Sequence, residues 1–291
     1  MTLLKAIIMG IIQGLTEFLP VSSSGHLAIF KHILKINTDT GLLFDIMLHF
    51  GTLVAIIVAF WEDFRQLVME GISLVGDLFY NLYVWIGKPC GKNPDEYRTM
   101  MKSPYRRFVI LILISTIPTG VIGVLAKDFI EQMSATVLVP GLCLILTGIE
   151  LVIADHLANG EKDERKATMK DAVLIGVSQA IATLPGLSRS GTTVTTCLSR
   201  QFQREFAVKY SFLMSIPAVL GATLFEVMDL SESTVQSSEL MPMILGTIVA
   251  AVVGFFCIKT MLVIVKQKKF TYFAVYCFIV GCIAVGYTII V

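Results

Sequence analysis

Two short stretches of the chain combine the residue types needed for chemistry on a phosphate. The first reads PVSSSGH over residues 20–26, and the second reads PGLSRSGTT over residues 185–193. Both follow an apolar run, and both place serines beside a glycine where a helix could begin. A helix N-terminus attracts anions, because its first N–H groups are unpaired and the helix dipole is positive there. The two stretches therefore indicate an anion site.

The small polar residues of these stretches are the candidates for binding a phosphate. They are Ser22, Ser24, Gly25, Ser188, Ser190, Gly191 and Thr192. Arg189 lies among them, and a guanidinium at membrane depth costs at least about 2.5 to 3.5 kcal/mol. Its planar fork suits a phosphate, although an ion pair of Arg189 with Glu17 that only locks the structure is an alternative. The corresponding alternative for the serines is bonding to their own backbone.

Acid–base residues beside the first stretch extend the prediction from binding to catalysis. Gln13 and Glu17 are four residues apart, so they share one face of a helix. His26 directly follows the serine-rich turn and can act as a general acid or base near neutral pH. Oxygens of Gln13 and Glu17 also suit Mg²⁺, or Ca²⁺, with the other ligands taken from substrate phosphates. These residues indicate phosphate chemistry or phosphate transport in a membrane.

The composition places these residues in an integral membrane protein. Of 291 residues, 55% are hydrophobic and 15% are charged, whereas soluble domains carry about 25% charged residues. Six apolar runs approach the length needed to cross about 30 Å of hydrocarbon. They extend over about 43–61, 105–127, 135–157, 206–228, 240–265 and 270–290. We predict an all-α fold, with residues 1–291 as one polytopic membrane domain of six transmembrane helices plus two re-entrant helical hairpins.

Other features of the sequence add smaller expectations. Residues 65–88 have a helical pattern interrupted by Glu70 and Asp77, which predicts an interfacial or cytoplasmic amphipathic helix, with a seventh crossing as the alternative. Glu150 lies toward the end of an apolar run, where we expect it to reach water. The six cysteines lack metal-binding spacing, so we expect neither disulfides nor a zinc site. The net charge of +1 and the lack of a basic tract favour lipid or solute partners and no nucleic acid.

An internal duplication relates the two stretches. A shift of 166 residues superposes AIIMGIIQGLTEFLPVSSSGH on AVLIGVSQAIATLPGLSRSGT and pairs Gly10 with Gly176. The repeat halves extend over about 1–160 and 167–291. In each half the stretch interrupts an apolar segment that is too short to cross twice. We favour a re-entrant hairpin in each half over one kinked helix, because matching broken segments in two halves are typical of a membrane binding site.

The distribution of charge predicts the orientation of the chain. Lysine and arginine concentrate in 62–107, 158–170 and 259–269, whereas 229–239 is acidic. By the positive-inside rule the first three loops are cytoplasmic and the last lies outside. Each half then holds three crossings and one hairpin, so the second half is inverted. Hairpins that enter from opposite faces can meet at their tips near the midplane.

The two stretches together resemble a known family. QGLTEFLPVSSSGH, from Gln13 to His26, looks like the (E/Q)xxxE segment and serine-rich loop of bacterial undecaprenyl-diphosphate phosphatase, the bacitracin resistance protein. LPGLSRSGTT looks like the PGxSRSG motif of the same family, and the resemblance extends over essentially the whole chain. It implies a membrane hydrolase that converts undecaprenyl diphosphate to undecaprenyl phosphate, which recycles the lipid carrier of cell-wall synthesis and gives bacitracin resistance.

The resemblance also implies roles for particular residues. The positions that match essential family positions are Glu17, Ser23, His26 and Arg189, with Gln13 at a position that varies between Glu and Gln. A glutamine there removes one carboxylate from the expected metal site. Our hypothesis is that Ser23 is the nucleophile and that His26 or Glu17 takes its proton. Attack by water, with Ser23 only binding phosphate, is the alternative.

The resemblance finally implies a location and a set of partners. We expect a multi-pass protein of the bacterial inner (cytoplasmic) membrane, with the site facing the periplasm or cell exterior. Its partners would be the polyprenyl diphosphate lipid and the surrounding membrane lipid, and we also allow for a homodimer. The rival interpretation is a polyprenyl-phosphate flippase or anion transporter that uses the same pocket, because inverted repeats with broken helices are common in transporters.

Overall fold

The structure is a computed structural model that describes residues 2–34, 36, 41–87, 96–134, 136–229 and 237–290. Over these residues the chain forms twelve α-helices, which confirms the all-α class. The helices are α1 (Leu3–Phe18), α2 (Ser23–Leu34), α3 (Gly41–Ala59), α4 (Trp61–Gly87), α5 (Pro104–Leu125), α6 (Lys127–Ser134), α7 (Leu138–His156), α8 (Met169–Ile181), α9 (Arg189–Ser199), α10 (Arg204–Asp229), α11 (Ser237–Lys266) and α12 (Thr271–Ile290).

Six of these helices are long and apolar enough to cross a membrane: α4, α5, α7, α10, α11 and α12. Five of them coincide with predicted crossings, but the predicted crossing at about 43–61 corresponds to α3, whose apolar part Leu43–Ala59 is shorter. The 19 residues of α3 still extend about 28 Å at 1.5 Å per residue. The sixth long apolar helix is α4, which we predicted as amphipathic. The mean hydropathy of α4 is the lowest of the six, 1.2, and its apolar part contains the carboxylates of Glu70 and Asp77.

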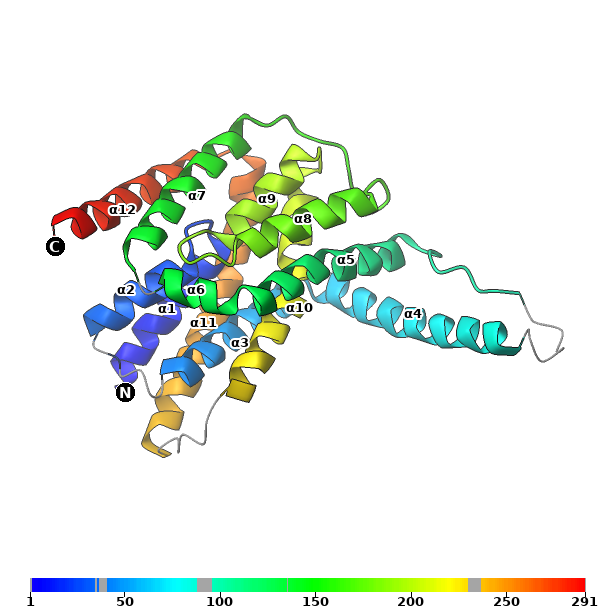
Figure 1. Ribbon diagram of the computed structural model, residues 1–291, viewed down its shortest axis with the longest axis horizontal. Helices are drawn as coiled ribbons and strands as arrows, with labels where there is room; N and C mark the ends of the chain where they lie inside the picture. Colours follow the sequence, from blue (N-terminus) through cyan, green and yellow to red (C-terminus); the bar gives the residue numbers. More distant parts are fainter. Residues whose placement is uncertain are drawn as a thin grey trace.

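Helices from distant parts of the sequence pack side by side (Figure 1). α1 lies along α11, and α8 lies along α5. A glycine stands at the closest approach in both pairs. A Cβ atom on Gly10 would lie 2.4 Å from the carbonyl oxygen of Gly246, and one on Gly176 would lie 2.3 Å from the carbonyl oxygen of Ser115. Gly10 and Gly176 are the two glycines that the 166-residue shift pairs, and each lies at a close contact with a helix from another part of the chain.

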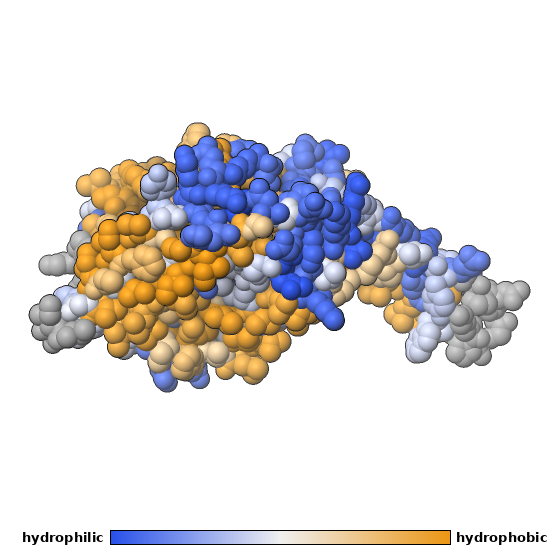
Figure 2. Space-filling model, turned by 90° about the horizontal axis from the view of Figure 1, so that it is seen from above, coloured by the Kyte–Doolittle hydropathy of each residue, from blue (hydrophilic) through white to orange (hydrophobic). Residues whose placement is uncertain are grey.

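The exterior of the molecule is largely apolar. Figure 2 shows a broad apolar surface beside a region where hydrophilic side chains gather. Large apolar side chains on several of the long helices face outward, among them Leu113 on α5, Leu142 on α7 and Val252 on α11, each about half exposed. Such side chains would be costly in water and are expected where lipid is the solvent. Together with the six long apolar helices, this exterior defines a multi-pass membrane protein.

The basic loops of the sequence lie on one face of the molecule. The Arg107 guanidinium donates to the carbonyl oxygen of Ala167 at 2.6 Å, which joins the first basic loop to the second. The Thr271 amide, directly after the third basic loop, donates to the Asp155 carboxylate at the end of α7 at 2.7 Å. The acidic loop 229–239 falls mostly outside the described residues. The shared face of the basic loops is the arrangement that the positive-inside rule requires.

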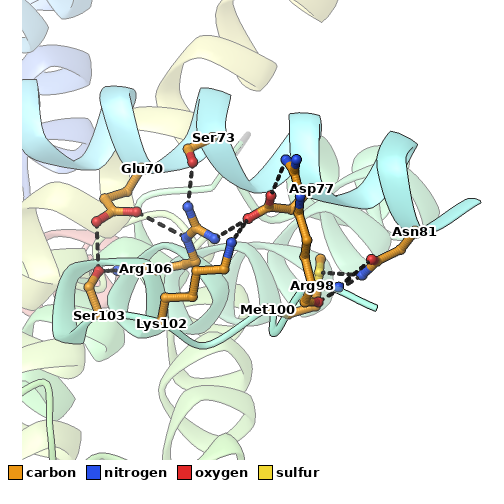
Figure 3. Close-up of polar contacts among 9 residues, drawn as sticks. All are labelled: Glu70, Ser73, Asp77, Asn81, Arg98, Met100, Lys102, Ser103 and Arg106. Carbon is orange, nitrogen blue, oxygen red and sulfur yellow. Dashed lines mark hydrogen bonds and ion pairs between the residues drawn. The ribbon is translucent and has the colours of Figure 1, made fainter. Parts of the chain in front are cut away.

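One helix stands apart from the others. α4 projects away from the rest of the molecule, with the start of α5 beside it (Figure 1). Polar side chains of α4 are bonded to residues 98–106, which precede and begin α5 (Figure 3). The five described cysteines are free thiols, and Cys90 lies outside the described residues.

Candidate active site

The two sequence stretches meet in space. Each forms the break between two helices, over residues 19–22 between α1 and α2 and over residues 182–188 between α8 and α9. The Gly186 amide donates to the Ser24 hydroxyl at 3.4 Å. A Cβ atom on Gly191 would lie 3.3 Å from the Cβ of Pro20. The predicted contact between the two stretches is therefore confirmed.

Both breaks use a left-handed backbone conformation to reverse the chain. Ser22 has φ 69° and Gly186 has φ 88°, a region that is uncommon for residues with a side chain. At Gly186 a Cβ atom would also lie 2.3 Å from the carbonyl oxygen of Pro140 in α7, so only glycine fits. Because the chain turns at Ser22, α2 begins at the next residue, Ser23. Ser23, Ser24 and Gly25 therefore belong to the first turn of a helix, one turn earlier than expected.

The Glu17 carboxylate, near the end of α1, is the centre of the site. One oxygen, Oε1, accepts a bond from Nη2 of Arg189, in an ion pair that joins the first stretch to the second. The other oxygen, Oε2, accepts a bond from the Ser23 hydroxyl at 2.7 Å and one from the Gln13 amide at 3.2 Å. The Glu17 side chain is 5% exposed, whereas that of Arg189 is 21% exposed. The expected approach of Arg189 to Glu17 is confirmed, and Arg189 is the partner that a ligand can reach.

His26 is held beside the centre without bonding to it. Its Nδ1 lies 2.7 Å from the carbonyl oxygen of Ser22, and because a carbonyl only accepts, Nδ1 carries the proton. Its Nε2 lies 2.5 Å from the hydroxyl of Tyr276 in α12, so in the neutral ring Nε2 accepts from that hydroxyl. Both ring nitrogens are engaged, and neither is directed at Ser23. Of the two bases in our hypothesis, Glu17 is the one that contacts the Ser23 hydroxyl.

The second stretch is partly occupied by its own backbone. The Ser188 hydroxyl caps α9 by accepting the Gly191 amide at 3.1 Å, and it lies 3.4 Å from the Ser190 hydroxyl. The Ser188 amide donates to the Thr147 hydroxyl at 3.0 Å. The amides of Ser188 and Gly191 thus already have acceptors within the protein, and the alternative of serines bonding to their own backbone applies to Ser188. A serine one residue before a helix caps it because the first helical amides need acceptors, and the PGLSRSG motif contains that signal.

Two glutamines at paired positions leave buried oxygens without a partner. Gln13 and Gln179 are separated by the 166-residue shift, and the Oε1 atom of each is buried with no hydrogen-bond partner. The Gln179 amide donates to the Thr119 hydroxyl at 3.0 Å, as the Gln13 amide donates to Glu17. Buried acceptors without partners are uncommon. A cation beside Gln13 would satisfy one of them. Among the described residues, no group of three or more His, Cys, Asp or Glu side chains is placed to hold a metal ion.

Two further residues join the site from helices that the sequence motifs do not include. Glu150 of α7 accepts a bond from the Thr192 hydroxyl at 2.7 Å, in the first turn of α9. Tyr276 of α12 bonds to His26. We expected Glu150 to reach water at the end of its span, but it is turned toward α9 and only partly exposed. An ionisable residue inside an apolar run was the one available signal for Glu150, and no local pattern marked Tyr276.

A buried carboxylate joins α8 and α9 at the end of the pair that is farther from Glu17, which we call the outer end. Asp171 in the first turn of α8 bonds to Arg200, at the end of α9, at 2.7 Å and to Lys162 at 3.0 Å. It also forms a capping box with Thr168. Burial raises the pKa of Asp171, but the bonds from Arg200, Thr168 and Lys162 outweigh it and lower the pKa to about 2. The two helices therefore meet at both ends.

Fold and site together define a class of protein. A multi-pass helical membrane protein that joins a carboxylate, a serine and an arginine between two serine-rich helix starts belongs with membrane proteins that act on phosphates. The comparison with known proteins narrows this class. The chain belongs to the family described as bacitracin resistance protein BacA, which it matches over residues 6–283. The resemblance noted from the sequence is thereby confirmed.

Individual relatives are similar along their whole length. The chain is 39% identical over 290 residues to the undecaprenyl-diphosphatase of Alkaliphilus metalliredigens, and the aligned part covers 100% of both chains. It is 38% identical over 281 residues to the undecaprenyl-diphosphatase of Halothermothrix orenii, which covers 97% of this chain and 96% of the relative. The undecaprenyl-diphosphatase of Methanosphaera stadtmanae is also 38% identical, over 283 residues and 97% of each chain.

Proposed function

We propose that the protein is an undecaprenyl-diphosphatase, which hydrolyses undecaprenyl diphosphate to undecaprenyl phosphate and phosphate. Membership of the BacA family and the names of the full-length relatives support this activity. The observation that carries the proposal is the bonding of Glu17, whose two oxygens hold Ser23 and Arg189 at once. The proposed nucleophile and the proposed phosphate-binding cation are thus each one hydrogen bond away from the proposed base.

Competition for Arg189 explains how the site would be activated. Without substrate, Glu17 is neutralised by Arg189, and a paired carboxylate is a weak base. The diphosphate is a stronger, bidentate partner for the guanidinium, and Arg189 is the more exposed member of the pair. Binding of substrate would draw Arg189 toward the phosphate and free Glu17 to accept a proton. The partner exchange would couple substrate binding to activation of Ser23.

The proposed reaction has two steps. Ser23 Oγ forms a bond to the terminal phosphorus, and the bond from that phosphorus to the bridging oxygen breaks. Undecaprenyl phosphate leaves with the electron pair of that bond, and the Oγ proton moves to Glu17. Water then attacks the phosphoserine, which releases phosphate and returns the proton to Oγ. Arg189 and the first amides of α2 would neutralise charge in both steps. His26 carries its proton on Nδ1, so it would protonate the leaving phosphate only after Tyr276 releases Nε2 and Nε2 takes up a proton from water. In the alternative, water attacks directly and Ser23 only binds phosphate.

A divalent cation fits the residues at one side of the site. Gln13 Oε1 is a buried acceptor without a partner, and Glu17 supplies a carboxylate beside it. Mg²⁺ commonly takes one or two protein oxygens and fills its other positions with water and substrate phosphate. We propose that Gln13 and Glu17 would hold Mg²⁺, with Ca²⁺ as the other option. The ion would add neutralisation of phosphate charge. Chelation by EDTA should then lower phosphate release, and Mg²⁺ should restore it.

We further propose that the α1–α2 and α8–α9 pairs are re-entrant hairpins of an inverted repeat, with halves of about 1–160 and 167–291. The bond between Arg200 and Asp171 supports this for the second pair, because it joins the end of α9 to the start of α8 on the face of the basic loops. The equivalent glycines at the α1–α11 and α8–α5 contacts support the repeat. In this arrangement α3, α5, α7, α10, α11 and α12 are the six crossings.

The orientation and the lipid tail follow from the same arrangement. The positive-inside rule places the face with the basic loops on the cytoplasmic side of a bacterial cytoplasmic membrane. The α1–α2 pair would then enter from the opposite face, and the site would open toward the cell exterior. An apolar groove of about 240 Å³ between α3 and α11, lined by Val54, Val58, Val252, Phe255 and Phe256 among others, could hold part of a polyprenyl tail. Its lining of Val, Ala and Phe side chains offers nothing to bind the charged diphosphate.

Hydrolysis in detergent micelles tests the proposed function. Purified protein with undecaprenyl diphosphate should release phosphate, and Glu17→Ala and Arg189→Ala should abolish the release while the variants still elute as folded protein. Micelles carry no gradient and have no second compartment, so a flippase or anion transporter would release nothing. Release that persists in both variants would show that the Glu17–Arg189 ion pair is a structural lock.

A further inference from the structure

The projecting helix α4 directs charged side chains toward the neighbouring segment of the chain and not toward its surroundings. Between Val68 and Ile86 the only charged residues are Glu70 and Asp77. Both face the segment that leads into α5, and the Asp77 side chain is 5% exposed. A helix in water normally shows its charges to the solvent and hides its apolar side. α4 does the opposite.

A closed network neutralises the two carboxylates (Figure 3). Arg106, itself buried, bonds to Glu70 at 2.9 Å and also to Asp77 and Ser73. Lys102 bonds to Asp77 at 2.8 Å. Ser103 donates to Glu70 at 2.7 Å. The inner face of α4 is therefore satisfied by the chain itself and needs no partner.

The outer face of α4 is apolar and uncovered. Four large side chains on it, Ile72, Phe79, Tyr83 and Ile86, are each at least 56% exposed. An apolar face of this extent marks an interaction site. Tyr83 stands toward the far end of this face, with the exposed Trp85 at its flank, and such rings favour the boundary between lipid headgroups and acyl chains.

The segment after α4 argues against a crossing, although α4 is long enough for one. Residues 96–103 run back beside α4 without forming a helix, and the Arg98 amide donates to the Asn81 side chain at 2.8 Å. Arg98 and Lys102 bring two cations into this segment. Non-helical backbone with charged side chains does not cross lipid beside a lone helix, because its amides would lose their hydrogen bonds. If α4 crossed the membrane, this segment would have to cross it as well.

We propose that α4 lies in the plane of the membrane, with its outer face inserted at the headgroup–acyl boundary of the leaflet from which α5 enters. The occupant of this face is the bilayer. The face continues from α3, which ends at Ala59 two residues before α4 begins, and the start of α5 at Pro104 lies beside it. Amphipathic helices with one fully apolar face bind membranes in this way.

Tryptophan fluorescence provides the test, because the only two tryptophans of the chain, Trp61 and Trp85, are both on α4. We would place a single tryptophan at mid-helix, in the variant Trp61→Phe/Trp85→Phe/Ile72→Trp. The full-length protein would be reconstituted in vesicles of phosphatidylcholine brominated either near the headgroup end or near the methyl end of the acyl chain. Leu113→Trp in the same background, mid-way along α5 and 52% exposed, gives the matched control for the bilayer centre.

The proposal expects stronger quenching of the tryptophan at position 72 by bromines near the headgroup, and the reverse order for the control at position 113. Stronger quenching at position 72 by the methyl-end bromines would show that α4 crosses, and would overturn the proposal. Quenching by neither lipid would place the face in water or against another protein and would equally overturn it. Phosphate release by each variant shows that it is folded, and the result does not depend on the proposed mechanism.

Discussion

The helix pairs α1–α2 and α8–α9 carry different side chains at positions that the 166-residue shift pairs. Ser23 in the first pair corresponds to Arg189 in the second. Both bond to the same carboxylate, Ser23 to Oε2 of Glu17 and Arg189 to Oε1. Glu17 itself corresponds to Thr183, so the second pair has no carboxylate of its own at that position. The two stretches thus resemble each other in sequence but place different side chains on the same carboxylate.

The same division holds one turn further along. His26 corresponds to Thr192. His26 bonds to Tyr276 of α12, and Thr192 bonds to Glu150 of α7. Each first turn is thus anchored to a residue on a long helix of the other half of the chain. In the proposed mechanism neither pair is a complete site, because the first pair would supply the groups that move protons and the second would supply the charge that binds phosphate.

Replacement of Arg189 should have the largest effect on catalysis. Arg189→Ala should lower kcat/KM for phosphate release by about 1,000-fold or more, because an arginine that stabilises a phosphoryl-transfer transition state contributes that much. Arg189→Lys should recover only part of the loss, since lysine lacks the bidentate fork. The measurement is release of phosphate from undecaprenyl diphosphate in micelles.

Arg200→Ala is the matched control, at the other end of α9. Arg200 bonds to Asp171 far from Glu17, so its loss should lower the melting temperature and leave kcat/KM within a few-fold of the unmodified protein. Equal losses of activity in both variants would show that Arg189 acts on the structure of the hairpin and not on the substrate.

Replacement of the proposed nucleophile should have the next largest effect. Ser23→Ala should lower kcat by about 100- to 1,000-fold, the range seen when one directly acting group is lost. Ser24→Ala removes the neighbouring hydroxyl, which contacts Gly186, and should cost much less. Acid quenching during turnover, followed by mass spectrometry, should find phosphate on Ser23. If Ser23→Ala keeps a rate close to that of Ser24→Ala and no phosphoserine is trapped, water is the nucleophile.

Much of this comparison could be predicted from the sequence, because it rests on local patterns. Serine, glycine and proline at the ends of apolar runs predicted the two helix breaks, and the repeated motif predicted that they meet at Glu17 and Arg189. The partners of His26 and Thr192 could not be predicted. Tyr276 and Glu150 lie 250 and 42 residues away from them, and contact between distant segments leaves no spacing in a single sequence.

Two other differences have physical causes of the same kind. Ser188 satisfies the start of its own helix before it can serve a ligand, because a buried amide without an acceptor is costly. Glu70 and Asp77 lie in an otherwise apolar part of α4, and their neutralising partners, Arg106 and Lys102, come later in the chain. Hydropathy averages count residues along one helix and do not include partners from another segment.

The anchors on α12 and α7 should have moderate and unequal effects. Tyr276→Phe removes the hydroxyl that holds His26, and loss of one such hydrogen bond, about 1 kcal/mol, corresponds to a rate loss of up to about tenfold. The pH profile of kcat should shift as well, because the His26 Nε2 atom loses its partner. Glu150→Gln keeps an acceptor for Thr192 and should change kcat by less. A larger loss in Glu150→Gln than in Tyr276→Phe would place the proton chemistry in the second copy and contradict the division drawn here.

Loss of the Asp171 carboxylate, which joins the start of α8 to the end of α9, should have the smallest effect on catalysis and a clear effect on stability. Asp171 has its pKa lowered from 3.8 to about 2 by its bonds, so the folded protein binds fewer protons at this group than the unfolded chain does between these values. The bonds therefore stabilise the fold fully above about pH 4, and this contribution, about 2 kcal/mol, is lost as the pH falls toward 2.

Thermal melting in detergent between pH 5 and pH 2 would measure this loss. Asp171→Asn should lower the melting temperature at pH 5 and flatten its dependence on pH, while phosphate release at neutral pH changes little. Glu161→Gln is the control, because its exposed ion pair with Lys166 should contribute little at any pH. If Asp171→Asn melts with an unchanged pH dependence, the α8–α9 pair is not held at its outer end by this carboxylate, and the position of Arg189 must be fixed by the contact between the two breaks alone.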